Sequence, residues 1–144
     1  MLDHNVRVGL GVDGSSSNDS SHMLNEARQA MLLQRVVHGA SAIGARDVLR
    51  TATRGGAEVL RRGNIGQIAP GFMADLAIYD THSIDLAGTH SDPLAALVFC
   101  GPIKTTHTII NGKLVVKDGQ LTTTDLNTLL QKHRALSIDL VNSA

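Results

Sequence analysis

Aromatic residues, cysteine and net charge are all scarce in this sequence. One tyrosine and two phenylalanines are its only aromatic side chains, and tryptophan is absent. Aliphatic side chains must therefore fill any core, for which the 42% hydrophobic content is sufficient. The single cysteine cannot form a disulfide within the chain. Because 13 basic residues balance 13 acidic ones, the positive excess of a nucleic-acid-binding protein is missing, and we expect no nucleic-acid partner.

Long apolar runs are also missing. No stretch approaches the roughly 20 residues that cross a bilayer, so we expect a soluble protein with no membrane partner. The N-terminus has neither the basic nor the long apolar region of a secretory signal, which predicts a cytoplasmic location. At 144 residues the chain is too short for a complete eight-stranded α/β barrel, which needs about 250 residues.

An alternating pattern at residues 6–12 predicts a β-strand that ends at an aspartate. Valine and leucine occupy every second position, with arginine and glycine between them. Asp13 continues the glycine face, which leaves room for a bulky neighbour, a metal or a substrate. An aspartate at the C-terminal end of a barrel-type strand occupies the position of catalytic groups in α/β barrels. Taken alone, this residue better fits a structural role, in which it caps the loop or begins an Asx-turn with Ser15.

Two amphipathic helices are expected after a polar loop at residues 14–21. The first is predicted for residues 22–37 and the second for residues 45–61. The loop offers three candidate N-terminal caps for the first helix: Asp19, Ser20 and Ser21. The Gly55-Gly56 pair weakens the second helix and therefore indicates close packing against another element. A terminal amphipathic helix is predicted from Asp125 onward.

The region between these helices is strand-like and rich in turn signals. A buried strand is predicted for residues 75–80 after a turn at Pro70-Gly71, and residues 94–100 form another apolar run. Asn111-Gly112 lies between two β-rich arms, which predicts a type I′ hairpin. Asp118-Gly119 predicts a second turn.

Residues 9–14 also satisfy G-x-G-x-x-G, the pattern of a dinucleotide-binding turn. The acidic residue expected about 20 positions later is absent, and a second helix stands where the next parallel strand belongs. A polar loop separates the glycines from the first helix, and Asp13 would repel a pyrophosphate. Dinucleotide binding is therefore the weaker interpretation.

Several motifs in order resemble the amidohydrolase superfamily. Residues 8–19 (VGLGVDGSSSND) resemble the eighth barrel strand and following loop of its branch that deaminates nucleobases and related heterocycles. Residues 66–76 (GQIAPGFMADL) are similar to the family's G-x-I-x-P-G-x-x-A-D-L signature, and the hairpin at residues 109–115 follows. With residues 25–31 and 99–102, these motifs look most similar to 8-oxoguanine deaminases and hydroxyatrazine-type aminohydrolases, over nearly the whole chain.

The resemblance implies a divalent metal ion, zinc or iron, and a small heterocyclic substrate. Asp13 matches the family aspartate that ligates the metal or accepts a proton from its bound water, so it is the candidate catalytic and metal-ligating residue. The implied reaction is attack of hydroxide on the ring carbon that carries the exocyclic nitrogen, with release of ammonia or an alkylamine. The family's H-x-H pair, later histidine ligands and proton-shuttling glutamate have no counterparts here, and the seven histidines contain no H-x-H.

Other reactive side chains have structural interpretations. Residues 15–19 are able to contact substrate, although capping and turn formation explain the same composition, and Ser15 has no placed base that would make it a nucleophile. Asp75 is expected to satisfy backbone groups, Cys100 to be a small buried residue, and His133 to face the core. Solvated positions are expected for three further features: His22, His38 and the Arg61-Arg62 pair.

Together these features predict the C-terminal portion of a metal-dependent aminohydrolase, of mixed α/β and β class. Residues 1–61 would supply the last strand and helices of an incomplete (β/α)8 barrel, residues 62–123 part of a flanking β-sandwich, and residues 124–144 a C-terminal helix. We expect the piece alone to expose apolar surface and to be inactive, and its full-length parent to be able to form a homo-oligomer. The alternative is a non-catalytic structural or association module derived from the same fold.

Overall fold

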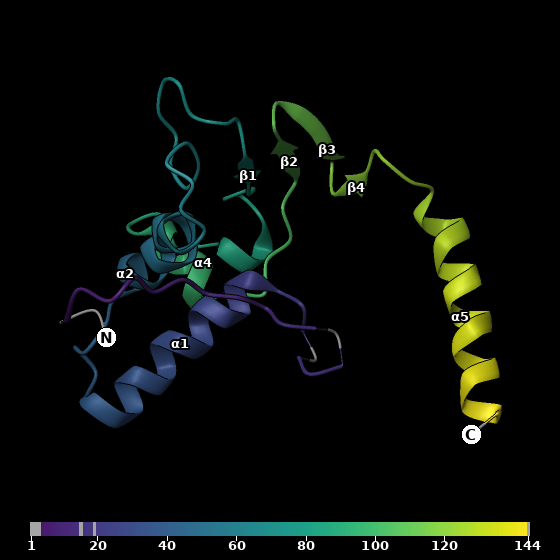
Figure 1. Ribbon diagram of the computed structural model, residues 1–144, viewed down its shortest axis with the longest axis horizontal. Helices are drawn as coiled ribbons and strands as arrows, with labels where there is room; N and C mark the ends of the chain where they lie inside the picture. The colour runs from purple at the N-terminus through teal and green to yellow at the C-terminus, as the bar shows by residue number, and fades with distance from the viewer. Residues whose placement is uncertain (1–3, 15, 19, 144) are drawn as a thin grey trace.

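The computed structural model describes residues 4–14, 16–18 and 20–143, which form a group of helices, a small antiparallel sheet and an outlying terminal helix (Figure 1). The helical segments in chain order are α1 (Met23–His38), α2 (Ala45–Arg50), the π-helical η2 (Thr51–Gly55), α3 (Gly56–Val59), the 3₁₀ turn η3 (Ile84–Leu86), α4 (Pro93–Phe99) and α5 (Leu126–Asn142). The strands are β1 (Leu76–Ile78), β2 (His107–Ile110), β3 (Lys113–Lys117) and β4 (Gln120–Leu121).

The main core lies between α1, α2 and α4. Its fully buried members are aliphatic or methionine side chains: Ala27, Met31, Ala45, Val48 and Val98. A smaller cluster links α4 to the segments on either side of it: Leu86, Ala96 and Ile103. The described aromatic side chains do not contribute a fully buried ring, as the composition predicts.

The first predicted helix is confirmed as α1, but two of its three predicted caps, Ser20 and Ser21, are wrong. His22 is the N-cap residue, and its side chain makes no capping hydrogen bond. Ser21 has φ +44°, which is incompatible with the extended backbone of an N-cap, and the Ser20 amide donates to Asn18 Oδ1 instead. Asp19 lies outside the described residues.

The second predicted helix is confirmed as a run through α2, η2 and α3, and its glycine pair packs as predicted. A Cβ added to Gly55 would lie 2.2 Å from the carbonyl oxygen of Val8, and one added to Gly9 would lie 3.0 Å from Gly56 Cα. The helix backbone therefore touches the extended segment that leads to Asp13.

The strand predicted for residues 6–12 is not formed: this segment runs across the helices without strand pairing (Figure 1). A strand exists only where a neighbouring strand pairs with its N–H and C=O groups. What lies beside Val8-Gly9 is helix backbone, which has already used its own N–H and C=O groups.

The sheet has the strand order β1-β2-β3-β4, with every neighbouring pair antiparallel. Asn111 and Gly112 have φ +49° and +75°, which confirms the predicted type I′ turn between β2 and β3. Asp118 and Gly119, with φ +50° and +74°, form the second predicted turn between β3 and β4.

The apolar run at residues 94–100 is helical, so its strand-like interpretation is wrong. Asp92 caps α4 by accepting from the Ala95 amide, and Pro93 occupies the first turn, where its missing N–H has no consequence. A short apolar run does not distinguish a buried strand from a buried helix, and the cap before it decides the outcome here.

Much apolar surface is exposed, as predicted. The accessible surface is 10,502 Å², whereas a compact monomer of this mass exposes about 7,100 Å². Among the described residues, no helix has the length and apolar character needed to cross a membrane.

Candidate functional site

Asp13 lies at the end of the extended segment, where the chain turns into the loop before α1. Its backbone has φ +63°, a left-handed conformation that aspartate adopts more readily than most residues, and its side chain is exposed. The Ser17 hydroxyl donates to Asp13 Oδ2 over 3.0 Å. Ser15, the Asx-turn partner considered from the sequence, lies outside the described residues.

The loop after Asp13 is tied to α1 through Asn18. The amides of Ser17 and Asn18 both donate to the Gly14 carbonyl, at 3.0 and 2.9 Å, which closes a tight turn. Asn18 Nδ2 then donates to Glu26 Oε1 over 2.8 Å, and Asn18 Oδ1 accepts from the Ser20 amide over 3.0 Å. Glu26 lies in the first turn of α1, where a carboxylate also suits the positive end of the helix dipole.

The glycine face was predicted to meet either a bulky neighbour or an open space, and its two glycines differ in this respect. A Cβ on Gly9 would lie 3.0 Å from Gly56 Cα, closer than ordinary van der Waals contact, so the helix backbone is the bulky neighbour there and leaves no room for a metal or substrate. Gly11, closer to Asp13, has nothing within 4 Å of where its Cβ would lie. A groove of about 400 Å³ lies beside the loop and is lined by residues that include Asn18, Glu26 and Arg28.

The residues present do not fit a metal ion by themselves. Among the described residues there is no group of three His, Cys, Asp or Glu side chains that could hold one. Asp13 offers one carboxylate, which accepts a hydrogen bond from the neutral Ser17 hydroxyl. Because structural and catalytic zinc sites use three or four protein ligands, Asp13 alone is an incomplete donor set.

Three side chains lie differently from their predicted positions. His133 and Cys100 are exposed, because no residue of α5 is buried and the end of α4 reaches the surface. His22 is half-buried rather than solvated, and its Nδ1 is shielded from solvent without a hydrogen-bond partner in the described part of the chain. The solvated position of His38 is confirmed.

The Asp75 carboxylate accepts a hydrogen bond from a backbone group, as predicted. Asp75 Oδ1 accepts from the Asn111 amide over 2.7 Å, which joins β1 to the hairpin turn.

Arg28 of α1 donates to the Phe99 carbonyl at the end of α4, and the Arg35 guanidinium lies 5.4 Å from the Phe99 ring centroid. The motifs at residues 25–31 and 99–102 therefore contact each other directly.

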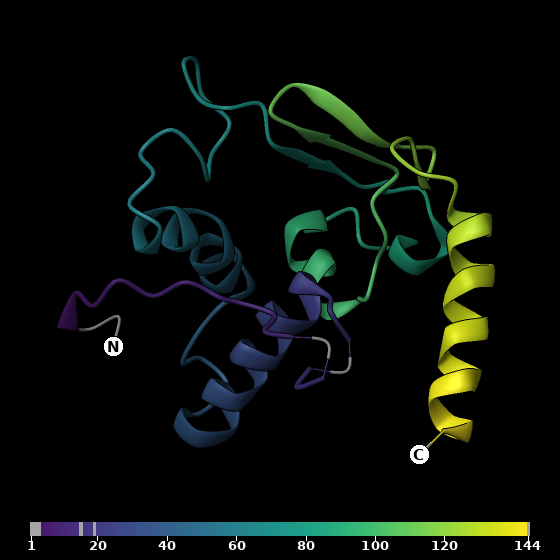
Figure 2. The same ribbon diagram turned by 45° about the vertical axis from the view of Figure 1, so that its right-hand side comes forward.

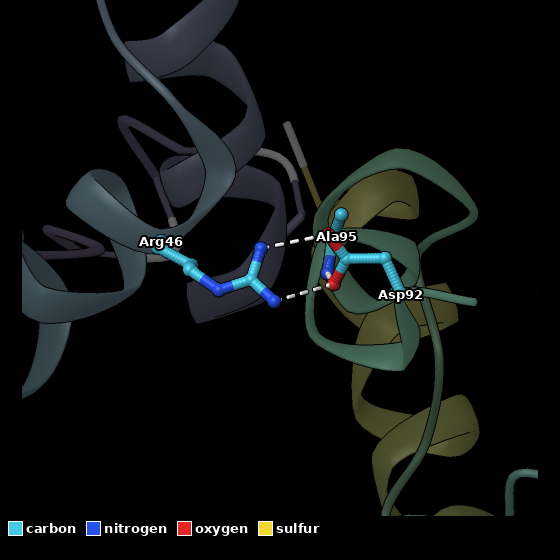
Figure 3. A network of polar contacts seen from close by, with 3 residues as sticks. All are labelled: Arg46, Asp92 and Ala95. Carbon is cyan, nitrogen blue, oxygen red and sulfur yellow. Dashed lines mark hydrogen bonds and ion pairs between the residues drawn. The ribbon is translucent and has the colours of Figure 1, made fainter. Parts of the chain in front are cut away.

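Two polar clusters were missed from the sequence because their members are far apart in it. Arg61 and Arg62, with Arg7 and Arg54, line an open groove of about 960 Å³ at the end of α3, so they are more than an isolated surface pair. In the second cluster, Figure 3 shows Arg46 of α2 forming two bonds with Asp92, at 2.7 and 3.0 Å, while Asp92 accepts from the Ala95 amide.

The Arg46–Asp92 pair changes the titration of both groups. The hydrogen bond from Arg46, together with that from the Ala95 amide, lowers the pKa of Asp92, and the hydrogen bond to Asp92 raises the pKa of Arg46. The sequence held one signal for this cluster, since Asp followed by Pro is typical of a helix N-terminus. No comparable pattern in the sequence pointed to Arg46 as the partner of Asp92.

The geometry of residues 9–14 argues against a dinucleotide-binding turn. Such a turn presents a helix N-terminus to the pyrophosphate directly after the glycines, whereas α1 begins only at Met23. Comparison with known sequences decides the matter, because the sequence model of the amidohydrolase family matches residues 1–115. The chain belongs to the amidohydrolase family.

The chain is similar in sequence to enzymes that act on small heterocycles. The chain is 44% identical to an 8-oxoguanine deaminase of Pseudomonas aeruginosa, over 93% of this chain and 30% of that protein. It is 41% identical to a hydroxydechloroatrazine ethylaminohydrolase of a Pseudomonas species, over 80% of this chain and 25% of that protein. The chain therefore spans about a third or less of the length of these curated relatives.

Solved amidohydrolase-like structures share the fold of the chain. An adenosine deaminase from Xanthomonas campestris with bound zinc aligns with a TM-score of 0.90 at 31% identity, over 99% of this chain and 33% of that one. The zinc complex of an atrazine chlorohydrolase from Arthrobacter aurescens aligns with a TM-score of 0.86 at 33% identity, over 94% of this chain and 30% of that one. The chain is thus a mixed α/β part of an amidohydrolase fold.

Proposed function

We propose that this chain is the C-terminal portion of an aminohydrolase that deaminates a purine-like or triazine ring by hydrolysing a carbon–nitrogen bond. The identity of 44% to an 8-oxoguanine deaminase over nearly the whole chain carries this proposal. In it, residues 1–61 end a barrel, residues 62–123 belong to a β-sandwich and residues 124–144 form a terminal helix.

Asp13 is the catalytic residue that the chain contributes. A carboxylate at this position takes a proton from the attacking water and returns it to the departing amine. Because the Ser17 hydroxyl holds Oδ2, Oδ1 is the oxygen that remains for this transfer. The further ligands that zinc or iron requires would come from outside this chain, since its described residues supply no cluster.

A chimera tests this proposal. The matched segment of the Pseudomonas aeruginosa 8-oxoguanine deaminase is replaced by this chain, and ammonia release from 8-oxoguanine is measured. We expect turnover by the chimera, a loss of about 10²-fold or more in Asp13→Asn, and no turnover by the 144-residue chain alone. Asp85→Asn is the matched control, because Asp85 is an exposed aspartate in η3.

Two outcomes would contradict the proposal. A folded chimera that is active but indifferent to Asp13→Asn would remove Asp13 from the reaction. A folded chimera with no turnover would instead favour the non-catalytic association module.

A further inference from the structure

The loop that follows Asp13 lies beside the first turn of α1 and bonds to that helix through a side chain (Figure 2). Asn18 Nδ2 donates to Glu26 Oε1 over 2.8 Å, in a partly buried position and eight residues away along the chain. The other side-chain bonds of the described loop residues join positions no more than four apart. The Asn18–Glu26 pair therefore ties this loop to the packed part of the molecule.

Glu26 is a fixed anchor for the loop. It directly precedes Ala27, which is fully buried, and Met31, about one turn later, is fully buried as well. Because these two side chains hold α1 in the main core, the backbone of Glu26 is held with them. Partial burial limits competition from water, and the ionised carboxylate strengthens the bond that it accepts from Asn18.

The side-chain amide of Asn18 has one orientation that satisfies both of its neighbours. Nδ2 must face Glu26, because an ionised carboxylate accepts hydrogen bonds and cannot donate them. Oδ1 then accepts from the Ser20 amide over 3.0 Å. An aspartate of the same shape at position 18 would keep this second bond, but it would replace the first by repulsion between two carboxylates.

The position of Asn18 is transmitted to Asp13 through the intervening turn. The amides of Ser17 and Asn18 both donate to the Gly14 carbonyl, at 3.0 and 2.9 Å. The Ser17 hydroxyl donates to Asp13 Oδ2 over 3.0 Å. Because Ser17 directly precedes Asn18, a shift of Asn18 moves the group that orients the Asp13 carboxylate. Asp13 is exposed, so packing contributes little to holding it.

We propose that Asn18 and Glu26 are positioning residues for Asp13: the hydrogen bond between them fixes, through Ser17, the direction in which Asp13 Oδ1 points. This inference rests on the proposed role of Asp13 in proton transfer. Such a transfer needs donor and acceptor atoms at about 2.6–3.2 Å, and a misplacement of about 1 Å costs on the order of 10²-fold in rate. A hydrogen bond that is remote from the reacting atoms therefore changes kcat.

Exchange of donor and acceptor within the pair tests this role in the chimera with the Pseudomonas aeruginosa 8-oxoguanine deaminase. Near neutral pH, Asn18→Asp sets two carboxylates against each other and should lower kcat about tenfold or more, with KM within about twofold. Glu26→Gln keeps an acceptor oxygen for Asn18 Nδ2 and should stay within about threefold of the original kcat.

The double variant Asn18→Asp/Glu26→Gln provides the rescue. Its side-chain amide at position 26 donates to the carboxylate at position 18, so the hydrogen bond is restored in the reverse direction and kcat should return to within about threefold. Damage to the loop that is unrelated to this bond would not be repaired by the second substitution. Asn25→Asp adds the same charge to the same turn of α1 and should leave kcat unchanged.

Hydrogen exchange gives a measurement that does not need turnover. In the 144-residue chain, exchange of the Ser17 amide, followed by NMR, should accelerate about fivefold or more in Asn18→Asp and slow again in the double variant. Unchanged exchange in Asn18→Asp would overturn the inference even if the chimera has no turnover.

The kinetic outcomes separate this inference from the proposed function. If Asp13→Asn abolishes turnover while Asn18→Asp keeps it, the positioning role is wrong and the proposed function stands. The same holds if the double variant stays as slow as Asn18→Asp. If turnover is indifferent to Asp13→Asn, the proposed function fails and the positioning role fails with it.

Discussion

The carbonyl oxygen of Val8 lies so close to Gly55 that a Cβ on Gly55 would be 2.2 Å from it. The contact joins the helical run after α2 to the extended segment that ends at Asp13. A Cβ on Gly55 would be fixed to the helix backbone, and the Val8 carbonyl belongs to the backbone of the extended segment. The clash could therefore be relieved only by moving one of these two segments. The placement of the candidate catalytic residue therefore depends on the absence of a side chain 42 positions later in the chain.

Gly55→Ala should destabilise the chain although alanine is the better helix former. Alanine gains up to about 1 kcal/mol of helix propensity, but the clash with the Val8 carbonyl costs about 2–3 kcal/mol. Gly56→Ala is the matched control, because its Cβ would have no atom within 4 Å, and it should be stabilising. Urea denaturation measures both, and equal effects at the two positions would contradict the contact.

The stability of the chain should depend on pH through Asp92. Its pKa is lowered in the folded state, chiefly by the hydrogen bond from Arg46, so the unfolded chain binds the proton more readily. The stabilisation is present above the ordinary pKa of aspartate and is lost as pH falls through the lowered value. Asp92→Asn keeps a capping side chain but should flatten the acid limb of the stability curve; denaturation midpoints from about pH 7 to about pH 3 measure this.

The pH dependence of stability in a second variant, Arg46→Gln, checks the prediction for Asp92. Arg46→Gln removes the same charge pair from the other side and should also flatten the acid limb. If both variants follow the pH dependence of the original chain, the pair contributes nothing to it.

Asp75→Ala should weaken the sheet at the hairpin. The Asn111 amide would lose its acceptor, at a cost of about 1 kcal/mol, because the turn is exposed and water replaces part of the bond. Asp75→Asn retains a side-chain oxygen and should cost less. Thermal unfolding compares the variants, and equal losses would show that the carboxylate charge, rather than the hydrogen bond, is what matters.

Glu26→Ala should loosen the loop after Asp13. Asn18 Nδ2 would lose its partner on α1, and exchange of the Asn18 and Ser20 amide hydrogens should accelerate about fivefold, the equivalent of one hydrogen bond of ~1 kcal/mol. Glu26→Gln keeps an oxygen acceptor and serves as the control. Unchanged exchange in Glu26→Ala would mean that the turn to the Gly14 carbonyl holds the loop unaided.

Features set by neighbouring residues were predictable from the sequence. Asn111-Gly112 accepts the left-handed backbone of a type I′ turn wherever it lies, and Asp125 caps α5 through the Asn127 and Thr128 amides at the predicted boundary. The order of the family motifs likewise identified the amidohydrolase family, which the match to residues 1–115 confirms. Each of these signals is local, or is a sum of local signals.

Features that depend on distant partners were decided by the tertiary structure. Residues 6–12 have a strand's pattern but no strand's partner, and residues 94–100 are helical because of the Asp92 cap. The pairing of Arg46 with Asp92, 46 positions apart, left no trace in the sequence. The sequence by itself determined turns, caps and family, because these depend on adjacent backbone geometry. Only the tertiary structure decided which segments pair and which side chains are buried, because pairing and burial need surfaces brought together from distant segments.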